Sequence, residues 1–339
     1  MNTYGKNFTI TIFGESHGPF AGVVIDGIKP GIKLSEEDFR EDLERRKNGD
    51  IPSLSKGVTA RQEEDIPIFI SGLLDGVATG APLAILFENR NQQSKDYSAF
   101  KDQPRPSHAD FAAFSKFKGF NDIRGGGMFS GRMTLPLVAA GTVARKSLEN
   151  AGFNITFKAV ISAIGGNKDA DKWEEIISSA KVEGDSLGGE IICRIDGVPA
   201  GKGAPFFDSM ESQIAHLAFS VPGVKGIQFG DFSDSPEGKN KASLMKGSEF
   251  NDPIIDSQGH TSTNHSGGIN GGLSNGNPIV FTLDIRPAAS IAKAQKTFNF
   301  KSGKTEKLSI GGRHDACIAL RCPVIAESVA AIALADILL

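Results

Sequence analysis

The chain has 339 residues, with 37 Lys and Arg against 40 Asp and Glu, a formal charge of −3 and 40 glycines. This balance excludes a globally basic nucleic-acid-binding protein, because phosphate backbones are held by an excess of Lys and Arg. The three cysteines lack CxxC spacing, which predicts no disulfide framework. The chain has no apolar run of about 18 residues and does not start with a basic and then an apolar segment, so we expect neither a membrane span nor a secretory signal. These features together predict a reducing, cytoplasmic compartment.

Alternating polarity and capping signals predict the elements of the first half of the chain. Ser35 and Asp38 have capping-box spacing before a stretch that Gly49 ends, so they indicate a capped helix. We expect strands over 7–13, 21–28, 66–71 and 82–88, and helices over 35–49, 108–118 and 132–150.

The second half continues with single strands and helices. We expect strands over 155–164, 189–196, 224–229 and 278–285, and helices over 171–180, 208–219 and 323–339, with Asp208 and Glu211 as a second capping box. There is no regular βαβ alternation and no Pro- or Ser-rich linker. The pattern therefore predicts an α+β fold with mainly antiparallel sheets, as one domain over residues 1–339. The glycine-rich connections 119–131 and 251–276 exceed ordinary loop lengths, which favours a functional role for them.

Residues 14–18, Gly-Glu-Ser-His-Gly, match the G-x-S-x-G nucleophile elbow of serine hydrolases. That elbow joins a strand to a helix, whereas the residues after Gly18 read as a strand, so a hydrolase is the weaker interpretation. A plain hairpin turn is the structural alternative. Because a turn does not require both Ser16 and His17 at its tip, we favour a functional site.

Further histidines and arginines stand on loops. His108 lies in the stretch Arg-Pro-Ser-His-Ala-Asp over 105–110, where Ser107 or Asp110 is equally suited simply to cap a helix. His265 precedes two glycines, and no histidine spacing fits a zinc motif, so we expect no metal.

Glycines between two arginines suggest an anion-binding loop. Residues 124–132 carry three successive glycines between Arg124 and Arg132, but both the dinucleotide fingerprint and the Walker A pattern fail in this chain. The remaining alternatives are an anion cradle of backbone N–H groups and guanidinium forks, or a flexible hairpin. Together with the charged stretch over 311–315, these loops predict a local positive pocket for a small, multiply anionic ligand.

Five of these stretches, in order and nearly in spacing, resemble the motifs of the chorismate synthase family: residues 13–18, 105–110, 224–226, 264–268 and 312–315. Residues 88–89 and 93–97 also fit, so the resemblance covers essentially the whole chain. It implies a β-α-β sandwich and the conversion of 5-enolpyruvylshikimate 3-phosphate to chorismate, the last step of the shikimate pathway to aromatic amino acids. The family's reaction is a 1,4-elimination of phosphate that requires reduced FMN without net redox change. Bidentate arginines suit a substrate with one phosphate and two carboxylates.

The resemblance also implies roles for individual residues. His17 resembles the acid beside the leaving phosphate, and His108 the donor to the pyrimidine edge of the reduced flavin. Asp315 resembles the base that removes the ring proton through the flavin, supported by Ser16 and Ser130. The positions implied to hold substrate anions are Arg46, Arg105 and Arg132. Those implied to bind flavin are Met128, Phe129, Ser130, Pro222, Gly223, Gly271, Arg286, Pro287, Ala288, Ala289, Ser290 and Arg313.

Some flavin-binding positions depart from the family's usual residues. Members often carry Arg-Ser-Ser where Met128-Phe129-Ser130 stands and Asn-Ala where Pro222-Gly223 stands, so a cation and a hydroxyl are lost. A non-catalytic flavin- or anion-binding module is therefore a third interpretation. The family also implies a homotetramer, and the length leaves no room for a fused reductase, so we expect a separate NAD(P)H-dependent enzyme to supply reduced FMN.

Overall fold

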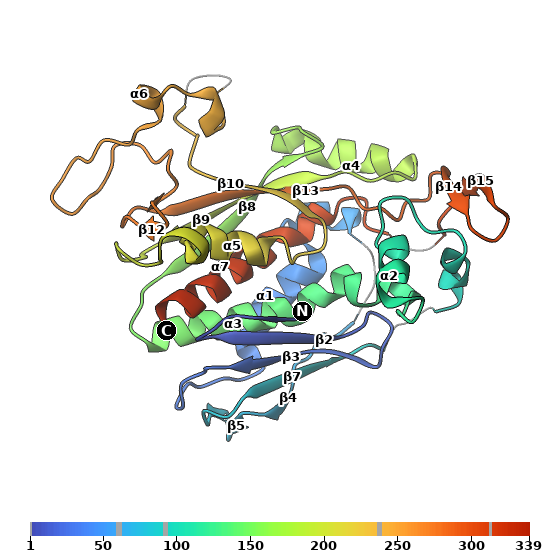
Figure 1. The fold of residues 1–339 in the computed structure, drawn as a ribbon, viewed down its shortest axis with the longest axis horizontal. Helices are drawn as coiled ribbons and strands as arrows, with labels where there is room; N and C mark the ends of the chain where they lie inside the picture. Colours follow the sequence, from blue (N-terminus) through green and yellow to red (C-terminus); the bar gives the residue numbers. More distant parts are fainter. Residues whose placement is uncertain (1, 59–62, 91–93, 236–238, 312–313) are drawn as a thin grey trace.

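Two antiparallel sheets enclose a layer of helices in the computed structural model, which describes residues 2–58, 63–90, 94–235, 239–311 and 314–339 (Figure 1). The strands are β1 Thr3–Tyr4, β2 Thr9–Gly14, β3 Phe20–Asp26, β4 Ile68–Ser71, β5 Leu73–Leu74, β6 Val77–Ala78, β7 Leu83–Glu88, β8 Thr156–Ile164, β9 Gly189–Asp196, β10 Val224–Phe229, β11 Ile269–Asn270, β12 Leu273–Ser274, β13 Ile279–Ile285, β14 Gln295–Asn299 and β15 Lys304–Leu308. The α-helices are α1 Glu37–Asn48, α2 Asp110–Phe117, α3 Thr134–Asn150, α4 Trp173–Val182, α5 Met210–Ala218, α6 Gly247–Phe250 and α7 Cys322–Leu338.

The larger sheets have five strands in the order β1-β2-β3-β7-β4 and four in the order β10-β13-β9-β8. Helix α3 packs on the inner face of the first sheet, and α7 packs on both α3 and the second sheet. Figure 1 shows α1, α3, α5 and α7 between the two sheets. The predicted α+β fold and the β-α-β sandwich are therefore confirmed.

Side-chain alternation explains how each sheet turns one face to the helices. Along β7, Leu83, Ile85 and Phe87 are fully buried, whereas the residues between them are half-buried. This period of two is the pattern expected of a strand with one face in the core. The helices supply the other side of that core.

Helix α7 is apolar on nearly every side, as expected of a helix surrounded by protein. The helical stretch Ile318–Leu338 is apolar and long enough to cross a membrane, although the sequence contains no uninterrupted apolar run of that length. In the structure 89% of an apolar 18-residue segment of that stretch is buried inside the fold, so it is the central core helix.

The predicted elements are present, with their ends shifted by one or two residues. The first predicted capping box is only half formed: Asp38 accepts the N–H of Ser35, but the N-cap residue of α1 is Glu36, whose side chain makes no capping bond. The second capping prediction is wrong: the hydroxyl of Ser209, rather than Asp208, accepts the N–H of Ser212 at the start of α5. Asp208 instead accepts hydrogen bonds from Lys6 and Gln213, because it lies one residue outside the cap position. The β14–β15 hairpin was not predicted.

Candidate active site

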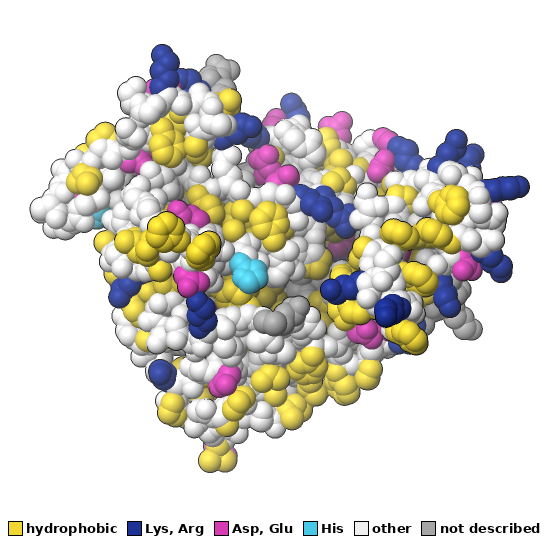
Figure 2. All heavy atoms as spheres, viewed as in Figure 1, with side chains coloured by type: hydrophobic (Ala, Val, Ile, Leu, Met, Phe, Trp, Pro, Cys, Tyr) yellow, Lys and Arg dark blue, Asp and Glu magenta, His cyan; other side chains and the backbone are white. Residues whose placement is uncertain are grey.

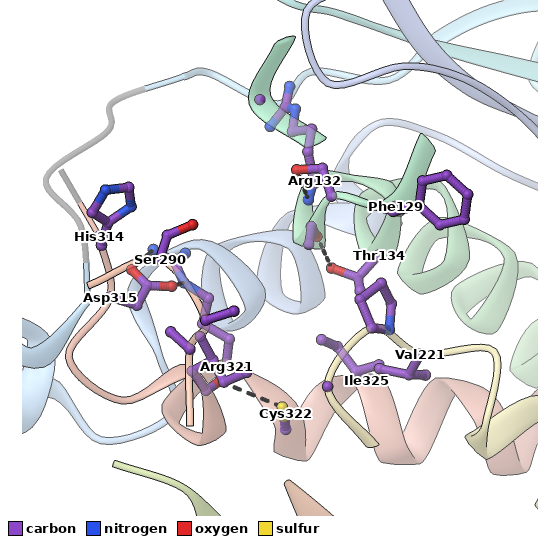
Figure 3. A pocket seen from close by; sticks show the side chains of 18 of the residues that line it. Phe129, Arg132, Thr134, Val221, Ser290, His314, Asp315, Arg321, Cys322 and Ile325 are labelled. Carbon is purple, nitrogen blue, oxygen red and sulfur yellow. Dashed lines mark hydrogen bonds and ion pairs between the residues drawn. The ribbon is translucent and has the colours of Figure 1, made fainter. Parts of the chain in front are cut away.

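A cavity of about 310 Å³ lies where the glycine-rich 124–133 segment, the ends of β10 and β13 and the C-terminal end of α1 meet (Figure 3). This volume is within the range of small-molecule sites. Many of the residues that the sequence assigned to substrate, flavin or catalysis line it. They are Arg46, Arg105, His108, Phe129, Ser130, Arg132, Pro222, Gly223, Arg286, Ala288, Ala289, Ser290 and Asp315.

Ser16 and His17 lie behind the wall of this cavity. A Cβ atom on Gly125, which lines the cavity, would stand 2.7 Å from Ser16 Oγ and 3.0 Å from His17 Nε2. The His17 ring also lies edge-on to the ring of Tyr97, another lining residue, with 5.1 Å between centroids. His17 therefore contacts the wall from outside, while His108 and Asp315 share the interior.

The structure contradicts the serine hydrolase interpretation. The turn that contains Ser16 connects β2 to β3, two paired antiparallel strands, and no helix follows it. Ser16 is only 2% exposed. A nucleophile elbow needs a strand-to-helix turn that presents its hydroxyl to the substrate.

Four predicted flavin-binding residues are not placed in the cavity. Met128 lines a neighbouring apolar cavity of about 320 Å³ next to β2 and α5. Gly271 lies in the turn between β11 and β12, near the start of β13, whereas Gly223 in the cavity lies near the end of β13. Pro287 is exposed beside the lining residues, and Arg313 falls outside the described residues.

Three successive glycines shape the cavity wall. Gly125, Gly126 and Gly127 have φ values of 59°, 86° and 54°, the left-handed region that residues with a Cβ atom rarely adopt. A Cβ atom on Gly126 would stand 3.3 Å from the ring of His108. The bare backbone thus lets His17 and His108 approach the same loop from opposite sides.

Asp110 organises the cations at one end of the cavity. Its carboxylate accepts hydrogen bonds from Arg105 Nε and Nη2, both at 2.8 Å, and lies 2.7 Å from His108 Nδ1. Burial opposes ionisation of Asp110, but the bonds from Arg105 and His108 outweigh it and hold the pKa of the carboxyl well below its usual range. With Nδ1 engaged, His108 presents its other ring nitrogen toward Gly126.

Arg132 is held on all sides by protein acceptors. It pairs with Asp65 and Glu63 at 2.5 Å each, donates to Asn89 at 3.0 Å, and donates to the Glu88 carbonyl at 3.2 Å. Little of this guanidinium is left for a ligand. The sequence analysis did not select Glu63 and Asp65. They lie in an acidic run, which could have indicated partners for the arginines of the site.

Arg46 is buried with weaker compensation. Its contacts are 3.1 Å to Thr134 Oγ1 and 3.4 Å each to Asp65 and the Gly131 carbonyl. Burial, together with the nearby positive charge of Arg132, lowers the pKa of Arg46 to about 9. A cation that is costly to bury attracts an anionic ligand more strongly than one already paired.

Asp315 lies across the cavity from Arg132 in Figure 3, next to Arg321. Arg321 donates from Nε to one carboxylate oxygen at 3.0 Å and from Nη2 to the other at 3.2 Å. Burial lowers the pKa of the adjacent His314, and the positive charge of Arg105 adds to this effect. The sequence analysis missed Arg321, although a lone cation in an apolar stretch was a usable signal.

The third histidine-bearing loop is not part of this cavity. His265 is buried between the rings of Phe232 and Phe250, and its backbone N–H donates to Asp252 at 2.8 Å. These contacts hold the 251–276 connection together away from Asp315.

The cavity therefore has the charge of an enzyme site for a small polyanion, with acid–base groups beside it. Comparison with known proteins gives the family. Residues 8–339 match the family model described as chorismate synthase, and the chain belongs to that family. It is accordingly a lyase of aromatic amino-acid biosynthesis, and the family uses reduced flavin.

Curated relatives match the chain along nearly its whole length. The chorismate synthase of Chitinophaga pinensis is 52% identical over 340 residues, covering 100% of this chain and 97% of the relative. That of Pyrococcus abyssi is 41% identical over 359 residues, covering 99% and 97%. A crystal structure of a chorismate synthase superposes with a TM-score of 0.71 at 22% identity, covering 98% of this chain and 92% of the other, and shows the fold.

Proposed function

We propose that this chain converts 5-enolpyruvylshikimate 3-phosphate to chorismate and phosphate by 1,4-elimination. The observation that carries the proposal is the cavity in which buried Arg46, half-buried His108 and the carboxylate of Asp315 lie together. A guanidinium suits the substrate's anions, a histidine donates to developing negative charge, and a carboxylate accepts the ring proton. Family membership supports the same reaction.

The cavity residues fit reduced FMN. The glycine loop leaves the space that side chains would fill, and Phe129, Val221 and Ile325 offer apolar surface beside Arg286 and Ser130. When bound, the reduced flavin supplies electron density to the breaking C–O bond. We propose that the lining residues Phe129, Ser130, Pro222, Gly223, Arg286, Ala288, Ala289 and Ser290 hold it, and that Met128, Pro287 and Arg313, which adjoin lining residues in the chain, assist.

His17 is proposed as the acid beside the leaving phosphate, and His108 as the donor to the anionic edge of the flavin. Contact of His17 with Gly125 and Tyr97 in the cavity wall supports the first role. The hydrogen bond that His108 Nδ1 donates to the Asp110 carboxylate, which fixes the orientation of the ring, supports the second. Ser16 and Ser130 are proposed to support Asp315, the base.

Arg46, Arg105 and Arg132 are proposed to hold the substrate's anions. Arg46 is the best supported of the three because its contacts with protein acceptors are the longest. Arg105 donates one hydrogen bond from its guanidinium to the Ser290 hydroxyl at 3.1 Å, whereas Arg132 is already bound by two carboxylates.

We also propose a homotetramer in the cytoplasm, served by a separate NAD(P)H-dependent flavin reductase. Exposed hydrophobic side chains on the outer face of the five-stranded sheet, among them Phe13, Ile68 and Ile70, support association. Figure 2 shows hydrophobic side chains gathered over this part of the molecule.

The proposal predicts phosphate release when the protein is incubated anaerobically with the substrate and reduced FMN. His17→Ala and His108→Ala should each lower kcat without unfolding the protein, as measured by phosphate release and circular dichroism. No release above background by folded wild-type protein would contradict the proposed reaction. Tight flavin binding without release would select a non-catalytic module instead, and full activity in both variants would discard the histidine roles.

A further inference from the structure

Arg321 joins two parts of the cavity that lie far apart in the sequence. On one side it binds both carboxylate oxygens of Asp315, at 3.0 and 3.2 Å. On the other, its Nη1 donates to the carbonyls of Arg46, at 3.1 Å, and of Lys47 in the last turn of α1. The proposed base and the proposed anion-binding Arg46 thus share one anchor.

Holding α1 in place does not depend on this arginine alone. The backbone N–H of Asp50, just after α1, donates to the Leu320 carbonyl at 3.0 Å. Arg45 in the same turn makes a bidentate bond to Glu327 of α7, at 2.7 and 2.9 Å. Because these bonds secure the end of α1, the fold does not by itself require the contact between Arg321 and Asp315.

We propose that Arg321 is a positioning residue for proton removal: it fixes the carboxylate of Asp315 in the orientation from which the ring proton is taken. This inference rests on the proposed function. In the elimination, the C–H electron pair becomes a new ring double bond, the existing ring double bond shifts toward the carbon that bears the phosphate, and the C–O pair leaves with the phosphate. The proton is taken up by the Asp315 carboxylate. A carboxylate that is turned away by a bond rotation no longer points at the proton to be removed, and a misplacement of about 1 Å can cost about 100-fold in rate.

The test is Arg321→Gln, which keeps a hydrogen-bonding side chain but removes the charged fork. We expect kcat to fall by about 10-fold to 100-fold with a much smaller change in KM. With substrate deuterated at the ring carbon that loses its proton, the isotope effect on kcat should rise above the wild-type value. Proton removal then limits turnover more strongly.

Two further variants separate positioning from general stability. Arg321→Lys should recover part of kcat, since one ammonium group binds a carboxylate but does not bridge both oxygens and the α1 carbonyls together. Arg194→Gln is the matched control, because Arg194 pairs with Asp196 on the outer face of the second sheet, and it should leave kcat and the isotope effect unchanged.

Several results would overturn the inference. Wild-type kcat and isotope effect in the glutamine variant, or a raised KM with an unchanged isotope effect, would show that Arg321 does not act on proton removal. If Arg321→Gln does not fold, the same measurements on Arg321→Lys decide the matter. Absence of phosphate release by the wild type is a distinct result, which removes the proposed function and this inference together.

Discussion

Individual cations in the cavity differ in how completely the protein neutralises them. Arg132 contacts two carboxylates and Arg105 contacts one through two bonds, whereas the contacts of Arg46 with the described residues are 3.1 Å or longer. The family resemblance implied Arg46 and Arg132 as anion-binding candidates, but how strongly each is already neutralised depends on Asp65, a residue distant from both in the sequence. Charge compensation of this kind is a property of the folded chain.

Asp110 links the site's electrostatics to stability. Its folded-state pKa lies well below the ordinary value, so its contribution to stability is present above the unfolded pKa of about 3.9 and is lost as the pH falls through the lower folded value. Asp110→Asn should therefore lower the free energy of unfolding by about 2 kcal/mol at pH 5 and pH 7. The difference from wild type should shrink at pH 3.

Urea unfolding at the three pH values measures this effect. Asp75→Asn is the control, because Asp75 is an exposed carboxyl in a turn where Asn tolerates the same backbone conformation. An equal difference between Asp110→Asn and wild type at pH 3 and pH 7 would contradict the electrostatic explanation.

At the scale of elements, the sequence predicts those helices and strands that a local pattern of apolar and polar residues determines. Strands such as β7 and the long helices α3 and α7 follow from period-two alternation and apolar runs. The β14–β15 hairpin is mostly polar and does not alternate apolar with polar residues, so its pairing depends on contacts with other segments. The left-handed turn of Gly125–Gly127 likewise depends on the residues that press against it.

The contact between α3 and α7 is close enough to require glycine. A Cβ atom on Gly141 of α3 would stand 2.4 Å from the Cβ of Ser328 on α7. Although alanine is the better helix former by about 1 kcal/mol, overpacking costs about 1–3 kcal/mol, so Gly141→Ala should destabilise the protein. Urea unfolding checks this, with Gly247→Ala in α6 as the control, where no atom lies within 4 Å of the added Cβ. A more stable Gly141→Ala variant would show that the helices separate freely.

For the whole molecule, composition and element order predicted the α+β class, and the family resemblance supplied the sandwich. Which ends of the elements meet at the cavity depends on long-range pairs that no local pattern reveals, such as the hydrogen bonds from the backbone of Lys6 and Asn7 to Asp336. One apolar core includes residues of both sheets, which supports the prediction of a single domain. The proposed tetramer likewise depends on contacts between the surfaces of subunits, which the residue pattern within one chain does not reveal.

An ion pair between a half-buried arginine and a buried glutamate connects the layers of the sandwich. Glu327 on α7 accepts two bonds from Arg45 on α1 and one from the backbone N–H of Ala159 on β8, at 2.9 Å. Removing one partner of a buried pair leaves the other charge without compensation, which costs about 3–5 kcal/mol in general. Asp50 still pairs with Arg45 at 2.6 Å, so we expect a smaller loss, about 2 kcal/mol, for Glu327→Gln.

Urea unfolding of Glu327→Gln measures this loss, and Glu37→Gln in the exposed pair with Arg40 is the control, expected to change stability by less than about 0.5 kcal/mol. The double variant Arg45→Met with Glu327→Leu removes both charges of the pair but leaves Asp50 without Arg45 and the Ala159 N–H without its acceptor, so it should recover only part of the lost stability. If Glu327→Gln unfolds at the wild-type urea concentration, the pair does not hold the layers together, and apolar packing between α1, α3 and α7 carries that contact instead.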